Sequence, residues 1–134
     1  MSREDATSDG RRPTDPVLGN NPVAYLISDA AGHFAVQFMR RDRRPVQGDA
    51  QRRAVGVGVN SSAINGYDGY FGRYRVGANS TVIQELEGAL SPDDVGKVVT
   101  RRFCITDAEL IIALETTATD GEPVTRTLRW RRVA

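Results

Sequence analysis

Seven short runs of strand-forming residues, separated by turn signals, constrain the fold of this 134-residue chain more than any other feature. Residues 29–32 and the Asp120-Gly121 pair are the clearest turns between them. Strands that follow one another at hairpin spacing pair as antiparallel neighbours, whereas parallel strands need a long crossover. The pattern therefore predicts an all-β, up-and-down antiparallel sandwich or barrel. The seven runs cover residues 22–28, 33–40, 70–76, 81–90, 97–105, 110–117 and 124–133.

Two regions lack this alternation. Residues 1–20 are rich in Asp, Arg, Gly and Pro and have no periodic apolar signal, so they are predicted to form a polar tail before a domain of residues 21–134. Residues 41–65 interrupt the strands with a polar, glycine-containing stretch. A connection of this length in a small domain is usually a binding loop or partly helical. We expect it to form a helical or loop lid over one opening, which gives the fold its minor α content.

The composition limits the cellular environment in which the protein is expected and the partners that it is expected to bind. The chain is 40% hydrophobic and 26% charged, with a formal net charge of +1, so it has no overall field that would attract nucleic acid or an anionic membrane. Its single cysteine, Cys104, cannot form an internal disulfide. No apolar run approaches the roughly 20 residues that span a bilayer, and the first residues lack the apolar segment of a signal peptide. These features favour a cytoplasmic globular domain.

The alternation of apolar and polar residues along the strands predicts that one charged residue points into the interior. Arg101 shares a mainly apolar face with Phe103 and Ile105, and an inward-facing arginine is costly unless an anion faces it. Glu85 and Glu87 share one face of the preceding strand, and we predict that one of them pairs with Arg101 at the base of an apolar pocket. The alternative is that Arg101 extends to the mouth of a barrel and both glutamates face water.

Other chemistry-bearing residues give weaker signals. His33 is the only histidine and could act as a general acid or base, but it begins a strand directly after a turn, where side chains are usually solvated. A lone histidine also argues against a transition-metal site. Cys104 alternates with Phe103 and has no adjacent base, so it is interpreted as an unreactive thiol. No cofactor is predicted and no catalytic role is assigned; the candidates are Glu87, Glu85, Arg101 and His33.

Several local strings, taken in order, extend over residues 21–133. The chain resembles the bacterial lipocalin-like domain family of the calycin superfamily in these strings. They are Asn21-Pro22-Val23-Ala24-Tyr25-Leu26-Ile27, Gly32, Val36-Gln37-Phe38-Met39-Arg40 with Asp42-Arg43, Gly69-Tyr70-Phe71-Gly72 with Tyr74, Glu87-Gly88-Ala89-Leu90 with Pro92 and Gly96, Arg101 with Phe103, and Leu128-Arg129-Trp130-Arg131-Arg132-Val133.

The resemblance implies an up-and-down lipocalin-like β-barrel with a cup for a small hydrophobic or amphipathic molecule. Calycin-like barrels include carriers and enzymes, so an isomerase, cyclase or dehydratase that uses the same cup for acid–base chemistry is the alternative. A third possibility is an interaction protein whose exposed strand edge joins another chain. The candidate ligand-binding residues are Tyr74, Glu87, Arg101, Trp130, Tyr25 and Gln37.

Two departures from the family pattern have consequences. The family usually opens with a further strand that carries a Gly-x-Trp-like motif, and no such string is present here. An Asn-Trp pair that follows the family's proline is replaced here by Asp93-Asp94, after Pro92. Without an opening strand, the sheet would have an unpaired edge, and an open edge invites pairing with another chain. The sequence therefore predicts a homodimer.

Overall fold

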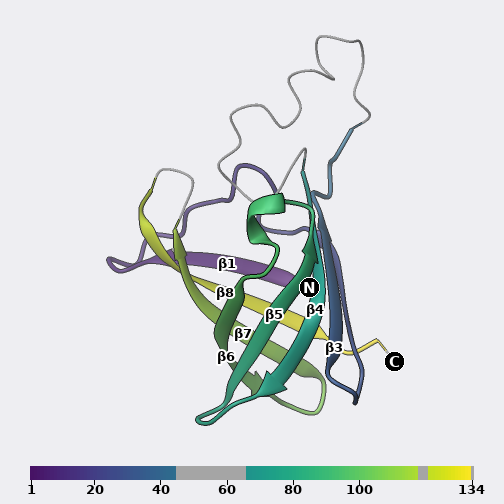
Figure 1. The fold of residues 1–134 in the computed structure, drawn as a ribbon. Helices are drawn as coiled ribbons and strands as arrows, with labels where there is room; N and C mark the ends of the chain where they lie inside the picture. Colours follow the sequence, from purple (N-terminus) through teal and green to yellow (C-terminus); the bar gives the residue numbers. More distant parts are fainter. Residues whose placement is uncertain (45–65, 118–120, 134) are drawn as a thin grey trace.

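The computed structural model describes residues 1–44, 66–117 and 121–133, and they form one curled antiparallel sheet of eight strands (Figure 1). The lid predicted for residues 41–65 lies almost entirely outside these described residues. The elements are β1 (Ser2–Thr7), β2 (Val23–Ser28), β3 (His33–Met39), β4 (Tyr67–Val76), β5 (Thr81–Ala89), the 3₁₀ turn η1 (Pro92–Asp94), β6 (Val98–Ile105), β7 (Glu109–Thr117) and β8 (Pro123–Arg131).

The seven predicted strands are all present, and the fold class is confirmed. From β2 to β8 each strand pairs with the next one along the chain, and the spatial order of the sheet is β1-β8-β7-β6-β5-β4-β3-β2. This is the up-and-down arrangement that hairpin spacing predicts. The described part of the chain contains no helix that is long and apolar enough to cross a bilayer.

The predicted polar N-terminal tail begins with a strand, so the prediction is wrong for these first residues. Ser2–Thr7 forms β1, which pairs antiparallel with β8 (Figure 1). Its inward-facing residues are Arg3, Asp5 and Thr7, all buried. A strand with charged residues on its buried face shows no alternation of apolar and polar residues. The sequence pattern therefore did not predict β1.

β1 occupies the place of the opening strand that the sequence was expected to lack. The edge of β8 is therefore paired, so the reason for expecting a homodimer is removed. The homodimer itself stays a prediction, because the sheet of described residues still ends at β1 and β2. Sedimentation at micromolar protein concentration tests it.

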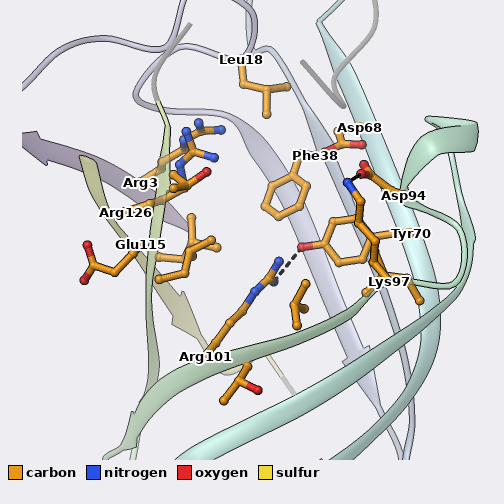
Figure 2. A pocket seen from close by; sticks show the side chains of 16 residues that line it. Arg3, Leu18, Phe38, Asp68, Tyr70, Asp94, Lys97, Arg101, Glu115 and Arg126 are labelled. Carbon is orange, nitrogen blue, oxygen red and sulfur yellow. Dashed lines mark hydrogen bonds and ion pairs between the residues drawn. The ribbon is translucent and has the colours of Figure 1, made fainter. Parts of the chain in front are cut away.

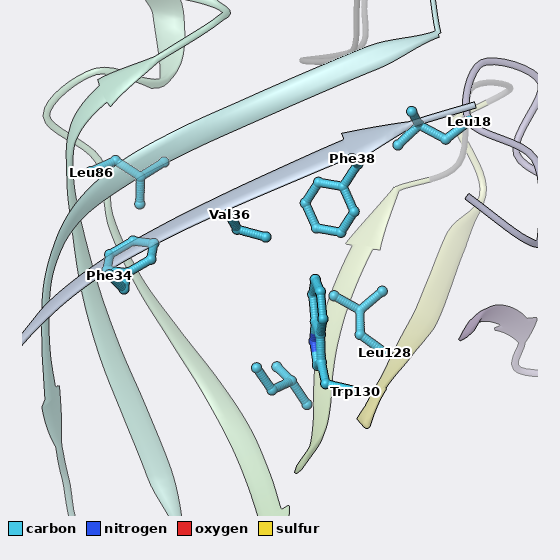
Figure 3. Packing of buried hydrophobic residues seen from close by; sticks show 8 residues of the cluster. Leu18, Phe34, Val36, Phe38, Leu86, Leu128 and Trp130 are labelled. Atoms are coloured by element: carbon cyan, nitrogen blue, oxygen red, sulfur yellow. The ribbon is translucent and has the colours of Figure 1, made fainter. Parts of the chain in front are cut away.

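The sheet curls until its two halves pack against each other. Phe38 of β3 contacts Trp130 of β8 with ring centroids 5.7 Å apart, although these strands lie at opposite sides of the sheet order (Figure 3). A register shift between Phe71 and Gly72 bends β4 against β5. Gly72 is required there, because a Cβ atom would lie 1.8 Å from the backbone oxygen of Glu85. The buried cluster consists of Leu18, Phe34, Val36, Phe38, Leu86, Ile112, Leu128 and Trp130.

Candidate functional site

The concave face of the curled sheet encloses a cavity of about 400 Å³ (Figure 2). Side chains from β3 to β8, together with Arg3 of β1 and Leu18, line it. Part of the wall is apolar and consists of Leu18, Phe38, Leu86, Val99, Leu114 and Leu128. The remaining wall is polar and consists of Arg3, Asp68, Tyr70, Asp94, Lys97, Thr100, Arg101, Thr116 and Arg126. Glu115 borders the cavity, but its exposed carboxylate is directed away from it (Figure 2).

Strand register places two of the arginines on either side of one leucine. Arg126 of β8 pairs with Leu114 of β7, and the register that pairs Arg102 with Ala113 puts Arg101 alongside Leu114. Directly paired residues in an antiparallel sheet point to the same face. Arg101 and Arg126 therefore reach the cavity from strands on the two sides of β7.

Arg126 belongs to a buried cluster of two arginines and two aspartates. Its Nε and Nη2 atoms donate to the two carboxylate oxygens of Asp5, at 2.8 and 2.9 Å. Arg3 donates to Asp15 at 2.5 Å, and the Arg3–Asp5 and Arg126–Asp15 pairs are each 3.7 Å apart. Asp15 also accepts backbone N–H bonds from Val17 and Leu18. The two positive and two negative charges compensate one another within the cluster.

The pKa values in this cluster shift in the directions that burial and pairing require. Burial by itself raises the pKa of the Asp5 carboxyl, but the hydrogen bonds and charge of Arg126, with the charge of Arg3, lower it below its ordinary value. Burial lowers the pKa of Arg3, as does the charge of Arg126, while Asp15 and Asp5 oppose this. Asp5 is therefore held as a carboxylate by its arginine neighbours.

Arg101 has a different environment. Its Nη1 atom donates to the Tyr70 hydroxyl at 3.0 Å, and its guanidinium carbon lies 5.6 Å from the centroid of the Tyr70 ring (Figure 2). Its Nε atom is buried without a hydrogen-bond acceptor. Among the described residues, no carboxylate forms an ion pair with Arg101. The positive charge of Arg101 thus faces a neutral hydroxyl and an aromatic ring.

Three further buried polar atoms on the inner face have no described partner. They are Nε of Arg3 on β1, Oε1 of Gln84 on β5 and the indole Nε1 of Trp130 on β8. Buried polar atoms without a partner are rare in folded proteins, and each one calls for a water molecule or a ligand. Together with Arg101 Nε, they show that the polar groups of the described interior do not fully satisfy one another.

The predicted pairing of Arg101 with a glutamate is wrong. Gln84 and Leu86 are the buried residues of the central part of β5, so the intervening Glu85 and Glu87 lie on the outer, exposed face. Glu87 accepts a bond from Arg73 there, at 2.7 Å. Both glutamates face water, as the alternative supposed, but Arg101 lines the cavity. Tyr70 occupies the place that the prediction gave to a carboxylate.

The other predicted site residues are dispersed. Trp130 and Tyr74 point inward, but they pack in and against the buried cluster and are not among the side chains that line the cavity. The hydroxyl of Tyr74 donates to the backbone oxygen of Asp29 at 2.7 Å. Tyr25 is 65% exposed on the outer face of the edge strand β2. Gln37 is also exposed and accepts a hydrogen bond from the Tyr67 hydroxyl.

The two remaining candidates for chemistry are also remote from the cavity. His33 is exposed at the start of β3, where its Nδ1 atom lies 3.0 Å from the carboxylate of Asp29. Hydrogen bonds from the backbone N–H and the ring of His33 lower the pKa of Asp29. Cys104 is exposed on β6. His33 therefore lies at a turn and Cys104 on the outer surface, and neither residue lines the cavity.

Sequence reasoning missed the contact between Arg101 and Tyr70 and the ion cluster around Arg126. Arg126, Leu128 and Trp130 are alternate residues of β8, and this alternation is the sequence signal that places Arg126 on the inner face. Arg3, Asp5 and Thr7 alternate in the same way, but without apolar neighbours. The sequence placed Tyr70 on a strand and in a string shared with the family, but its contact with Arg101 crosses the interior between β4 and β6, which a local pattern does not encode.

Comparison with known proteins agrees with this architecture. A family model described as a lipocalin-like domain matches residues 1–133. Searches of curated proteins and of solved structures found no match. The family match includes β1, the strand that sequence patterning missed, and it extends through the last strand of the sheet. The chain belongs to the lipocalin-like domain family.

Proposed function

We propose that this protein binds a small amphipathic molecule in the cavity on the concave face of its sheet. The observation that carries the proposal is the composition of the wall, where an apolar surface adjoins the incompletely bonded guanidinium of Arg101. A cavity of about 400 Å³ falls within the range of roughly 300–1,000 Å³ that is usual for small-molecule sites. Such sites combine apolar walls with a few polar groups that orient the ligand.

The enzymatic alternative has less support. Three of its four candidate residues, Glu85, Glu87 and His33, lie outside the cavity. The fourth, Arg101, lines the cavity, but a guanidinium does not act as a general acid or base near neutral pH. A general acid or base must come within hydrogen-bond reach of the reacting atom, directly or through one water. The third possibility, an interaction protein, predicted no well-formed cavity. Binding of a small molecule is therefore the function that we carry forward.

Titration with the neutral fluorescent probe N-phenyl-1-naphthylamine tests this function. Saturable binding with enhanced fluorescence is expected for the wild-type protein. Leu114→Trp should fill the cavity and abolish most of the signal, because Leu114 lies in its wall. Ile111→Trp, on the opposite face of the same strand, is the matched control and should bind normally. Circular dichroism establishes that both variants fold.

Two results would contradict the proposal. One is the absence of saturable binding to the wild-type protein. The other is equal binding by folded Leu114→Trp and Ile111→Trp, which would place the probe elsewhere. Native mass spectrometry of the purified protein adds an independent readout, with a retained small molecule as the expected observation.

A further inference from the structure

The basic side chains at the cavity differ in how their charges are compensated. Lys97 donates to Asp94 at 2.6 Å, Arg126 makes two bonds to Asp5, and Arg3 bonds to Asp15. Arg101 is the exception in the described part of the wall, because its one described acceptor is the neutral hydroxyl of Tyr70. We propose that the ligand supplies the missing anion, as a single carboxylate or similar oxyanion that binds Arg101.

The chemistry of the guanidinium favours this class of ligand. Arginine has five N–H donors in a planar fork that matches the two oxygens of a carboxylate. Arg101 is partly buried and commits one described donor, to Tyr70. A neutral hydroxyl offers one acceptor atom and no charge, whereas a carboxylate offers two acceptor oxygens for a bidentate pair and a negative charge that compensates the guanidinium. Figure 2 shows the guanidinium of Arg101 reaching into the space between the two sides of the cavity.

Tyr70 orients the arginine for this role. Its hydroxyl accepts from Nη1, and its ring lies 5.6 Å below the guanidinium carbon, so the two contacts hold the arginine head at one position. Tyr70 itself packs against the rings of Phe34 and Phe38. The anchor thus rests on a side chain that the core immobilises.

The surroundings limit the ligand to one anionic group and an apolar body. Val99, Leu114 and Leu86 continue the wall away from Arg101 and suit an alkyl or aryl group. The other basic side chains of the described wall already bond to carboxylates of the protein, so a second negative charge on the ligand would find no further cation to pair with. A small apolar monoanion therefore fits the cavity better than a dianion of equal size.

This inference rests on the proposed function, and the test separates the two. Decanoate, decan-1-ol and decanedioate compete for the cavity against bound N-phenyl-1-naphthylamine at neutral pH. Decanoate is expected to compete at least about tenfold more tightly than decan-1-ol, from the strength of hydrogen bonds to charged groups. Decanedioate should be weaker than decanoate. Equal competition by decanoate and decan-1-ol overturns the inference and leaves the proposed function intact, whereas failure of the probe itself overturns both.

Variants of Arg101 test whether this residue causes the preference for decanoate over decan-1-ol. Arg101→Met should bring the ratio of decanoate to decan-1-ol affinities close to one, while the probe still binds. Arg102→Met is the matched control, since Arg102 points to the outer face and bonds to Glu115 there, at 3.2 Å. It should keep the wild-type ratio. Arg101→Lys retains the charge without the fork and should give an intermediate ratio. A ratio unchanged by folded Arg101→Met or Arg101→Lys would contradict the assignment of the anchor.

Discussion

Arg126 and Arg101 reach the same cavity from the two sides of Leu114, yet they differ in what faces them. β1 brings Asp5 beside Arg126, so a carboxylate of the protein compensates that charge. No described strand brings a carboxylate to Arg101, whose neighbour is Tyr70. The difference separates a structural arginine, which fastens the first strand to the last, from an arginine whose charge is available to a ligand.

Removing Asp5 should have the largest effect on stability. Asp5→Ala leaves Arg126 and Arg3 buried with Asp15 as their remaining carboxylate, and breaking a buried pair costs about 3–5 kcal/mol. Urea unfolding measures the change. Glu4→Ala, on the outer face of the same strand, should change the free energy of unfolding by less than about 0.5 kcal/mol. Equal losses in the two variants would show that the cluster does not fasten β1.

Acid should weaken the same half of the molecule. Because the pKa of Asp5 is lower in the folded protein than its ordinary value, its contribution is fully present above the unfolded value of about 3.8. That contribution is lost as the pH falls through the folded pKa. Unfolding measured from pH 6 down to pH 2 should show a steeper loss for the wild type than for Asp5→Asn. Parallel curves would mean that Asp5 carries no linked proton.

Removing the hydroxyl that accepts from Arg101 should lower the free energy of unfolding by less than the removal of Asp5. Tyr70→Phe keeps the ring beneath the guanidinium but deletes the hydroxyl that accepts from Nη1, and one such bond contributes about 1 kcal/mol. Tyr67→Phe is the control, because its hydroxyl bonds to Gln37 on the outer face. The preference for decanoate should persist in both variants, though more weakly in Tyr70→Phe. Its complete loss in Tyr70→Phe would make the tyrosine, not the arginine, the anchor.

The sequence predicted the part of the fold in which apolar and polar residues alternate. The strands from β2 to β8 and the inward position of Arg101 followed from that alternation. β1 could not be found in this way, because Arg3 and Asp5 become favourable interior residues only when β8 and the loop of Asp15 supply their partners. The partner of Arg101 was misassigned for a related reason. Glu85 and Glu87 are close in the sequence to inward positions, but the period of two turns them outward.

The free energy of unfolding of ligand-free Arg101→Met, compared with that of Arg126→Met, tests the central distinction most directly. Arg126→Met should lose about 3–5 kcal/mol, because it leaves the buried carboxylate of Asp5 without its two principal bonds. Arg101→Met should change the free energy of unfolding by less than about 1 kcal/mol, since it leaves no buried carboxylate of the described residues without its partner. A loss in Arg101→Met as large as that in Arg126→Met would contradict the account, because Arg101 would then be a structural residue with a partner of its own.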